Sequence, residues 1–201
     1  MEIKSIDQLR ELYGYPNGRA RVKSLTCLEK HAINFIAKSP FIVISTSSKD
    51  YKLDASPRGG IPGFVKVLNN TTVIIPDAKG NNRVDSLSNI TETGQIGLLF
   101  LIPGVDETLR INGKATISTQ PEYLKLLDAE KNPPKVCIVV SIEELFLHCA
   151  KAFMRSKLWD NDAKVERSQL PTMGQMLNDQ LSIDAPIESQ KDMVERYKKD
   201  L

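Results

Sequence analysis

The sequence predicts a mainly β (α+β) fold, in which six or seven antiparallel strands form a closed or partly closed barrel with helices around it. Between residues 41 and 149, apolar runs rich in β-branched residues follow one another, and short turns join most of them. Helical periodicity is confined to the ends of the chain and to two short interruptions between strands. We expect one domain over residues 1–201, made of N-terminal helices (1–38), the barrel (39–160) and a C-terminal helical tail (161–201).

The composition is that of an ordinary globular protein, with 41% hydrophobic residues, 26% charged residues and a net charge of +2. The first 160 residues contain 21 Lys and Arg against 17 Asp and Glu, and the last 41 contain 6 against 8. Nucleic-acid-binding proteins usually have a much more basic surface, so we expect no nucleic-acid partner. The sequence has no apolar run of about 18 residues, so we expect no membrane-spanning helix.

The cysteines indicate a reducing compartment. Cys27, Cys137 and Cys149 are odd in number and have no CxxC spacing. Cys137 and Cys149 have apolar neighbours in the sequence, so we expect both to be reduced core residues. The N-terminus lacks the apolar region of a signal peptide. A cytoplasmic location is therefore the simplest expectation.

Two helices are predicted before the first strand. The first covers residues 5–13, where Ser5 is a suitable N-cap and apolar residues recur with helical spacing. The second covers about residues 19–37, with an apolar stripe that runs from Val22 to Ile36. Ser39-Pro40 ends it, because the residue before a proline disfavours helical geometry.

The first half of the barrel contains four predicted strands, at residues 41–48, 53–60, 64–68 and 71–75. Pro57 donates no backbone hydrogen bond, so its strand cannot be a normal central one. We expect an irregular strand whose end presents Ser56 and Arg58. Asn69-Asn70 tolerates positive φ and predicts a two-residue hairpin turn.

The segment from Gly80 to Ile90 predicts a polar loop followed by a short helix. Val84, Leu87 and Ile90 form its apolar stripe, and Arg83 lies at the first turn with Ser86 close by. The start of a helix has free backbone N–H groups and a positive dipole end, so a cation and a hydroxyl beside it suit a phosphate. An ordinary capped surface helix has the same pattern, and both interpretations stay open.

The second half of the barrel is predicted from strands at residues 96–102, 110–118, 136–140 and 143–149, with a helix at 120–129. In the second of these strands Arg110 and Lys114 share one face, which is either solvated or turned towards an anionic ligand. In the tail, a helical stripe indicates a helix docked on the body or on a partner chain. Its members are Leu170, Met173, Leu177 and Leu181.

Familiar catalytic motifs are absent from the sequence. It has no GxGxxG opening a βαβ unit, no P-loop, no HExxH and no GxSxG. The two histidines are far apart, so we predict no metal site, and we identify no catalytic residue. Cations and hydroxyls are nevertheless frequent at strand and helix ends, which fits either an anion site or scattered solvated charges. They are Ser56, Arg58, Arg83, Ser86, Arg110, Lys114, Lys151 and Arg155.

Residues 30–160 resemble the FMN-binding split-barrel family related to pyridoxamine 5′-phosphate oxidase. The resemblance rests on the combination of several short motifs. They are Asp54-Ala55-Ser56-Pro57-Arg58-Gly59, Ile75-Pro76-Asp77, the segment from Gly80 to Ile90, Thr108-Leu109-Arg110-Ile111-Asn112-Gly113, and Arg155-Ser156-Lys157-Leu158-Trp159. The oxidase's own C-terminal substrate-binding pattern is not found, so the resemblance is to an uncharacterised branch and not to the vitamin B6 oxidase proper.

This resemblance implies a six-stranded antiparallel split β-barrel with flanking helices and a homodimer that binds FMN at the subunit interface. It also implies positions for the cofactor-binding residues. Ser56, Arg58 and Gly59 would follow the flavin ring and ribityl chain, with Ile75 and Pro76 at a strand end beside them, and Arg83 and Ser86 would hold the phosphate. Thr108 and Arg110 would reach the cofactor from the partner side, and Lys151, Arg155 and Trp159 would lie near the same site.

The resemblance thus implies an FMN-dependent oxidoreductase that transfers hydride or electrons to or from a small organic substrate. The flavin performs the redox chemistry and the protein binds and orients it, so no general acid or base is named. One alternative is a non-catalytic flavin-binding or flavin-sensing protein. Another is a split barrel that holds haem or a deazaflavin in place of FMN, although the scarcity of histidine argues against haem.

Overall fold

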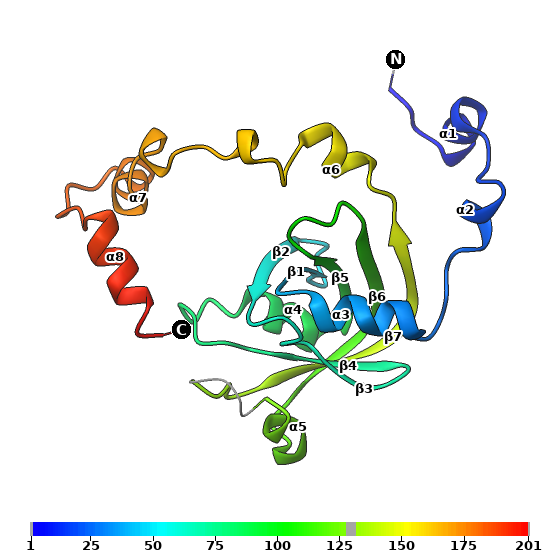
Figure 1. Ribbon diagram of the computed structural model, residues 1–201, viewed down its shortest axis with the longest axis horizontal. Coiled ribbons are helices and arrows are strands. Elements are labelled where there is room, and N and C mark those ends of the chain that lie inside the picture. Colours follow the sequence, from blue (N-terminus) through cyan, green and yellow to red (C-terminus); the bar gives the residue numbers. More distant parts are fainter. Residues whose placement is uncertain (1, 128–131, 201) are drawn as a thin grey trace.

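A computed structural model describes residues 2–127 and 132–200 (Figure 1). Its centre is one seven-stranded antiparallel sheet with the strand order β2-β1-β5-β6-β7-β4-β3. The strands are β1 (Phe41–Ser47), β2 (Leu53–Gly59), β3 (Lys66–Asn69), β4 (Thr72–Pro76), β5 (Gln95–Leu101), β6 (Thr108–Ser118) and β7 (Cys137–His148). The α+β class with an antiparallel sheet and flanking helices is confirmed, and the sheet has one strand more than the six that the resemblance implied.

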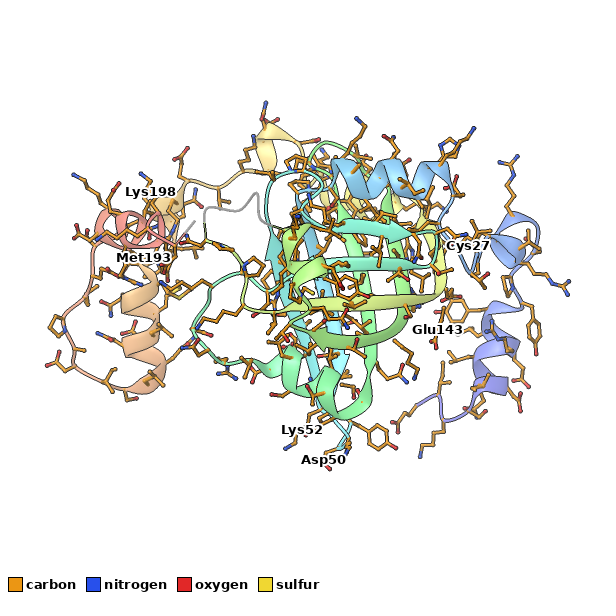
Figure 2. The ribbon with its side chains drawn as sticks, turned by 90° about the horizontal axis from the view of Figure 1, so that it is seen from below. Cys27, Asp50, Lys52, Glu143, Met193 and Lys198 are labelled. Atoms are coloured by element: carbon orange, nitrogen blue, oxygen red, sulfur yellow. The ribbon has the colours of Figure 1, made fainter. Side chains whose placement is uncertain are left out.

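Eight α-helices lie in the described ranges, and those at residues 30–38 and 85–93 pack against strands of this sheet. The eight helices are α1 (Ile6–Tyr13), α2 (Arg19–Val22), α3 (Lys30–Lys38), α4 (Asp85–Thr93), α5 (Pro121–Lys125), α6 (Lys151–Ser156), α7 (Met173–Leu181) and α8 (Gln190–Tyr197). No helix of the described residues is long and apolar enough to cross a membrane. Figure 2 shows the barrel in the middle, with the chain ends on opposite sides of it.

The core lies inside the curled sheet, because alternate residues of each strand point inward. Ile42 and Ile44 of β1 and Phe100 of β5 are fully buried there, and α3 adds Ile36. β2 is an edge strand paired only with β1 in the sheet order, which suits Pro57 because an edge strand needs fewer backbone donors. The inward alternation predicted from the apolar runs therefore accounts for the core.

The prediction of one helix over residues 19–37 is wrong. Helix α2 ends at Val22, and the backbone groups of Leu25 then exchange two hydrogen bonds with Leu145 of β7, at 2.9 and 2.8 Å. A new helix, α3, begins at Lys30, where the Glu29 carboxylate accepts hydrogen bonds from two backbone N–H groups. Pairing with a distant strand replaced the local helical bonds, so the stripe from Val22 onwards belongs to two separate elements.

Several boundaries also differ from the predictions. Helix α4 begins at Asp85, so Arg83 lies just before the first turn, and Val84 is exposed outside the apolar stripe. The strands predicted at 136–140 and 143–149 form one strand, β7, which has a bulge at Glu143 where its register against β6 shifts. The helix predicted at 120–129 ends at Lys125, and residues 128–129 lie outside the described residues. Cys137 is buried as expected, but Cys149 is exposed.

Candidate cofactor-binding site

The larger of two candidate sites is a cleft of about 940 Å³, which we call the β2–α4 cleft. Its walls are the end of β2, the loop of residues 77–84, the first turn of α4 and residues 132–135. Six of the twelve predicted cofactor-binding residues line it. These are Ser56, Arg58, Gly59, Pro76, Arg83 and Ser86. Ile75 is adjacent in sequence but fully buried in the core, because neighbouring strand residues point to opposite faces.

Arg58 is held at the wall of the cleft by its neighbours. Its Nη1 donates to Ser56 Oγ at 2.8 Å and to the Pro57 carbonyl at 3.0 Å, and its Nη2 lies 3.8 Å from the Asp77 carboxylate. Ser56 and Arg58 share one face of β2 because they are two residues apart. The Nε atom of Arg58 is buried and has no hydrogen-bond partner within the described residues. The guanidinium therefore keeps a donor available.

The second wall is the start of α4. Val84 has a φ of 47°, and no side chain of the described residues caps the first turn. Its free N–H groups therefore remain available to an anion. Each polar side chain here is already bonded to a carboxylate: Ser86 Oγ donates to Asp54 at 2.5 Å, and Arg83 Nε donates to Asp85 at 2.8 Å.

The cleft contains both signs of charge. Four carboxylates and four cations line it: Asp54, Asp77, Asp85 and Asp200, with Arg58, Lys79, Arg83 and Lys135. Partial burial raises the pKa of Asp77, and the nearby Arg58 charge opposes this shift only in part. Asp54 and Asp77 were missed as site residues by the sequence analysis. The signal for Asp54 was available, since it shares the face of Ser56 and Arg58 on β2.

We expect Asp77→Asn to change how stability depends on pH. Because the folded pKa of Asp77 is raised, the folded state binds its proton more tightly, and stability falls as pH rises from the ordinary Asp value through the raised one. The asparagine variant has no proton to lose at this position. Its free energy of unfolding should therefore rise relative to that of the wild type across this pH range, and the difference should stay constant at higher pH. Urea unfolding at several pH values measures this difference. Asp50→Asn, in the exposed turn after β1 (Figure 2), is the control. A constant difference between Asp77→Asn and wild type across the range would contradict the burial of Asp77.

The other predicted residues lie outside the β2–α4 cleft of their own chain. Thr108 is buried at the start of β6, opposite His148. Lys151 and Arg155 are exposed on α6, and the Trp159 indole donates to the Val105 carbonyl at 3.0 Å. Apart from the buried Ile75, the structure thus divides the predicted set in two: one group lines the cleft, and the second group lies near the start of β6 and the end of β7.

Arg110 belongs to this second group and lines a hollow of about 360 Å³ on the outer face of the sheet. Its guanidinium lies 4.8 Å from the centre of the Phe146 ring and 3.8 Å from the Glu144 carboxylate. Hydrogen bonds from Ser24 and Asn112 lower the pKa of Glu144. Burial lowers the pKa of His148 at the edge of the hollow, and the charges of Lys23 and Arg110 add to this. The alternation of residues 144, 146 and 148 on β7 was the signal that could have identified them.

Fold and cleft together define a β-sheet protein whose strand and helix ends present cations, hydroxyls and free N–H groups to one cleft. The chain belongs to the pyridoxamine 5′-phosphate oxidase family, whose model matches residues 28–149. This confirms the family that the sequence motifs indicated.

Solved structures similar to this chain include HupZ of Group A Streptococcus, at 16% identity and a TM-score of 0.51 over 60% of this chain and 93% of HupZ. An FAD-binding protein of Mycobacterium smegmatis is 15% identical, with a TM-score of 0.43 over 62% of this chain and 97% of that protein. An F420 reductase is 12% identical, with a TM-score of 0.42 over 60% and 98% of the two chains. At such identities the likeness shows the fold alone. Among curated proteins, none matches this chain.

Proposed function

We propose that this chain binds FMN in the β2–α4 cleft and uses it to transfer hydride or electrons to or from a small organic substrate. The main observation is that Ser56 and Arg58 on β2 meet Arg83 and Ser86 near the start of α4. FMN has a dianionic phosphate, a polar ribityl chain and a flat ring. These groups need cations, hydroxyl partners and backbone N–H donors, which are the groups that line this cleft.

The cleft fits such a cofactor in three respects. The buried Nε of Arg58 lacks a partner inside the described chain, and a polar ligand would supply one. The uncapped first turn of α4 suits a phosphate. The volume of about 940 Å³ lies in the usual range for cofactor sites. When bound, FMN supplies the redox chemistry, and these residues bind and orient it.

The carboxylates of the cleft limit which side chains can bind the phosphate of FMN. Asp54 accepts the hydrogen of Ser86, and Asp85 accepts from Arg83. A hydroxyl has one hydrogen to donate, so Ser86 can bond the phosphate only after it turns from Asp54. Arg83 has further N–H groups and can bind Asp85 and a phosphate together. We therefore assign the larger share of phosphate binding to Arg83 and the free N–H groups of α4.

We also propose a homodimer with FMN at the subunit interface. Thr108, Arg110 and Trp159 lie outside the cleft of their own chain, so they can reach its cofactor only from a partner. The outer sheet face around Arg110 is a hollow with the apolar walls Val43 and Leu99. Under two-fold symmetry, such a face in one copy can meet the cleft of the other, and both sites form together.

Two other functions remain to be distinguished. A non-catalytic flavin-binding or flavin-sensing protein would have the same cleft without turnover. The names of the FAD-binding protein and the F420 reductase among the similar structures support a different flavin or deazaflavin as the cofactor. The carboxylates of the cleft do not discriminate among these cofactors, because all of them contain a phosphorylated ribityl chain.

The visible absorption spectrum of the purified full-length protein tests the proposal. We expect flavin bands, either as purified or after added FMN is bound and the excess is removed. Anaerobic addition of NADH or NADPH should then bleach the bands, and an acceptor should restore them. Bound FMN that no reductant bleaches would favour the sensing function. A deazaflavin or haem spectrum would change the cofactor, and a protein that stays colourless with added FMN would refute the proposal.

A further inference from the structure

The two ends of the chain lie outside the part that the family model matches. That part is residues 28–149. The N-terminal segment, residues 2–22, contains α1 and α2, and the C-terminal arm, residues 160–200, contains α7 and α8. Figure 1 shows the two on opposite sides of the barrel, and Figure 2, in which Met193 and Lys198 mark the arm, agrees. Both are therefore additions to the core that contains the cleft.

The C-terminal arm exposes a complete apolar stripe. Met173, Leu177 and Leu181 recur at helical spacing on α7, and Leu170, which was predicted as part of this stripe, lies before the helix in extended backbone. Between 45% and 63% of each of these four residues is exposed. The arm has some internal order, since Asn178 Nδ2 donates to the Ala185 carbonyl at 2.7 Å. It meets the barrel at its end, where Lys79 and Asp200 form an ion pair. The residues of the stripe stay open to solvent.

The N-terminal segment also exposes an apolar stripe. Every residue of α1 is exposed, and Ile6, Leu9 and Tyr13 form an apolar stripe on it. Helix α1 has 8 residues and α7 has 9. Helices shorter than about 12 residues are marginal in water unless a packed apolar face stabilises them. Both stripes therefore require a surface that their own barrel does not provide.

We propose that the C-terminal arm packs against the N-terminal segment of a second copy of this chain, with the Leu177 stripe on the Leu9 stripe. The two segments have opposite net charge: residues 2–22 contain 4 Lys and Arg against 3 Asp and Glu, and residues 160–200 contain 6 against 9. They cannot meet in one chain, because the barrel separates them (Figure 1). In a two-fold dimer each arm meets the partner's segment, so the contact forms twice and leaves no open end.

This arrangement extends the proposed homodimer but does not depend on FMN. The exchanged contacts would stabilise the dimer independently of the cleft. The arm starts at residue 160, shortly after α6. Helix α6 contains Lys151 and Arg155, which belong to the second group of predicted cofactor residues. The arms would therefore hold Lys151 and Arg155 at the subunit interface.

Cross-linking in the full-length protein tests the contact. The exposed cysteines are removed as Cys27→Ser and Cys149→Ser, and buried Cys137 is retained. In this background one chain contains Leu9→Cys and a second, distinguished by a tag of different mass, contains Leu177→Cys. The two are co-expressed so that mixed dimers form during folding, and a short bismaleimide is then added. We expect a covalent product with one chain of each kind, with and without FMN.

Leu53→Cys replaces Leu177→Cys in the matched control. Leu53 is 85% exposed on β2, so its thiol would be at least as reactive. Cross-linked mixed dimers from Leu53→Cys at the same yield, or none from Leu177→Cys, would overturn the proposal. Leu177→Glu should separately raise the dimer dissociation constant about tenfold or more, whereas Leu53→Glu should not. Because neither measurement uses flavin, a failure here is distinguishable from a failure of the FMN proposal.

Discussion

Replacing Gly113 with alanine is expected to lower the free energy of unfolding by about 3 kcal/mol. Gly113 is buried opposite the bulge in β7, where the register shifts after Asn112 and Glu143 is left without a partner in the pairing. A Cβ atom at this position would approach the backbone carbonyl oxygen of Ser141, and it would also lie 3.1 Å from the carbonyl carbon. The obstacle is backbone in the middle of the sheet, so it cannot move aside as a flexible side chain would.

Urea unfolding measures this difference, and Gly80→Ala is the matched control. A Cβ at Gly80 meets no atom within 4 Å, so its effect should stay within about 0.5 kcal/mol. If Gly113→Ala unfolded at the urea concentration of the wild type, the bulge and the register of β6 against β7 would be wrong. A strongly destabilised variant also predicts poor recovery of soluble protein, which gives a second readout.

Replacing Arg83 with alanine is expected to weaken FMN binding about tenfold or more, since charge-assisted hydrogen bonds to phosphate are among the stronger polar contacts. Arg83 lies immediately before α4, next to the free N–H groups of its first turn. In the structure its partner is Asp85, and the side chain is largely exposed, so the substitution should leave stability nearly unchanged. Titration of flavin fluorescence measures the dissociation constant.

Two variants make this test specific. Arg19→Ala removes an exposed cation from α2, far from the cleft, and should leave FMN affinity unchanged. Asp85→Asn should strengthen FMN binding, because it removes a negative charge that competes with the phosphate for Arg83. Wild-type affinity in Arg83→Ala would refute the phosphate assignment. Weaker binding in Asp85→Asn would show that Asp85 positions Arg83 instead of competing for it.

The strands were predictable because their signal is local. β1 and β5 were expected at residues 41–48 and 96–102, and each lies within one residue of those limits. Their side chains alternate or are apolar throughout, and that pattern depends only on the next few residues. The Ser5 cap predicted for α1 is also local, and in the structure the Gln8 backbone N–H donates to Ser5 Oγ. Helix 19–37 failed because the competing partner of Leu25 is Leu145, 120 residues away.

The sequence predicted which types of residue form the candidate site, but not which of them lie together in one cleft. The motifs identified cations and hydroxyls at strand ends, and the curvature of the sheet brings Ser56 and Arg58 to Arg83. The sequence offered no means to see that Asp54 and Asp85 would bind Ser86 and Arg83 first, because those distances depend on how β2 packs against α4. It also left open where the Leu177 stripe would dock.

By itself the sequence determined the class of fold, the family and the chemical character of the site. These depend on periodicity and on residue types at element ends, which are properties of short segments. Only the tertiary structure decided which of those residues share one cleft, which lie on the outer face of the sheet, and that both chain ends leave their apolar stripes exposed. The reason is that long-range strand pairing and sheet curvature set these distances, and no local pattern encodes them.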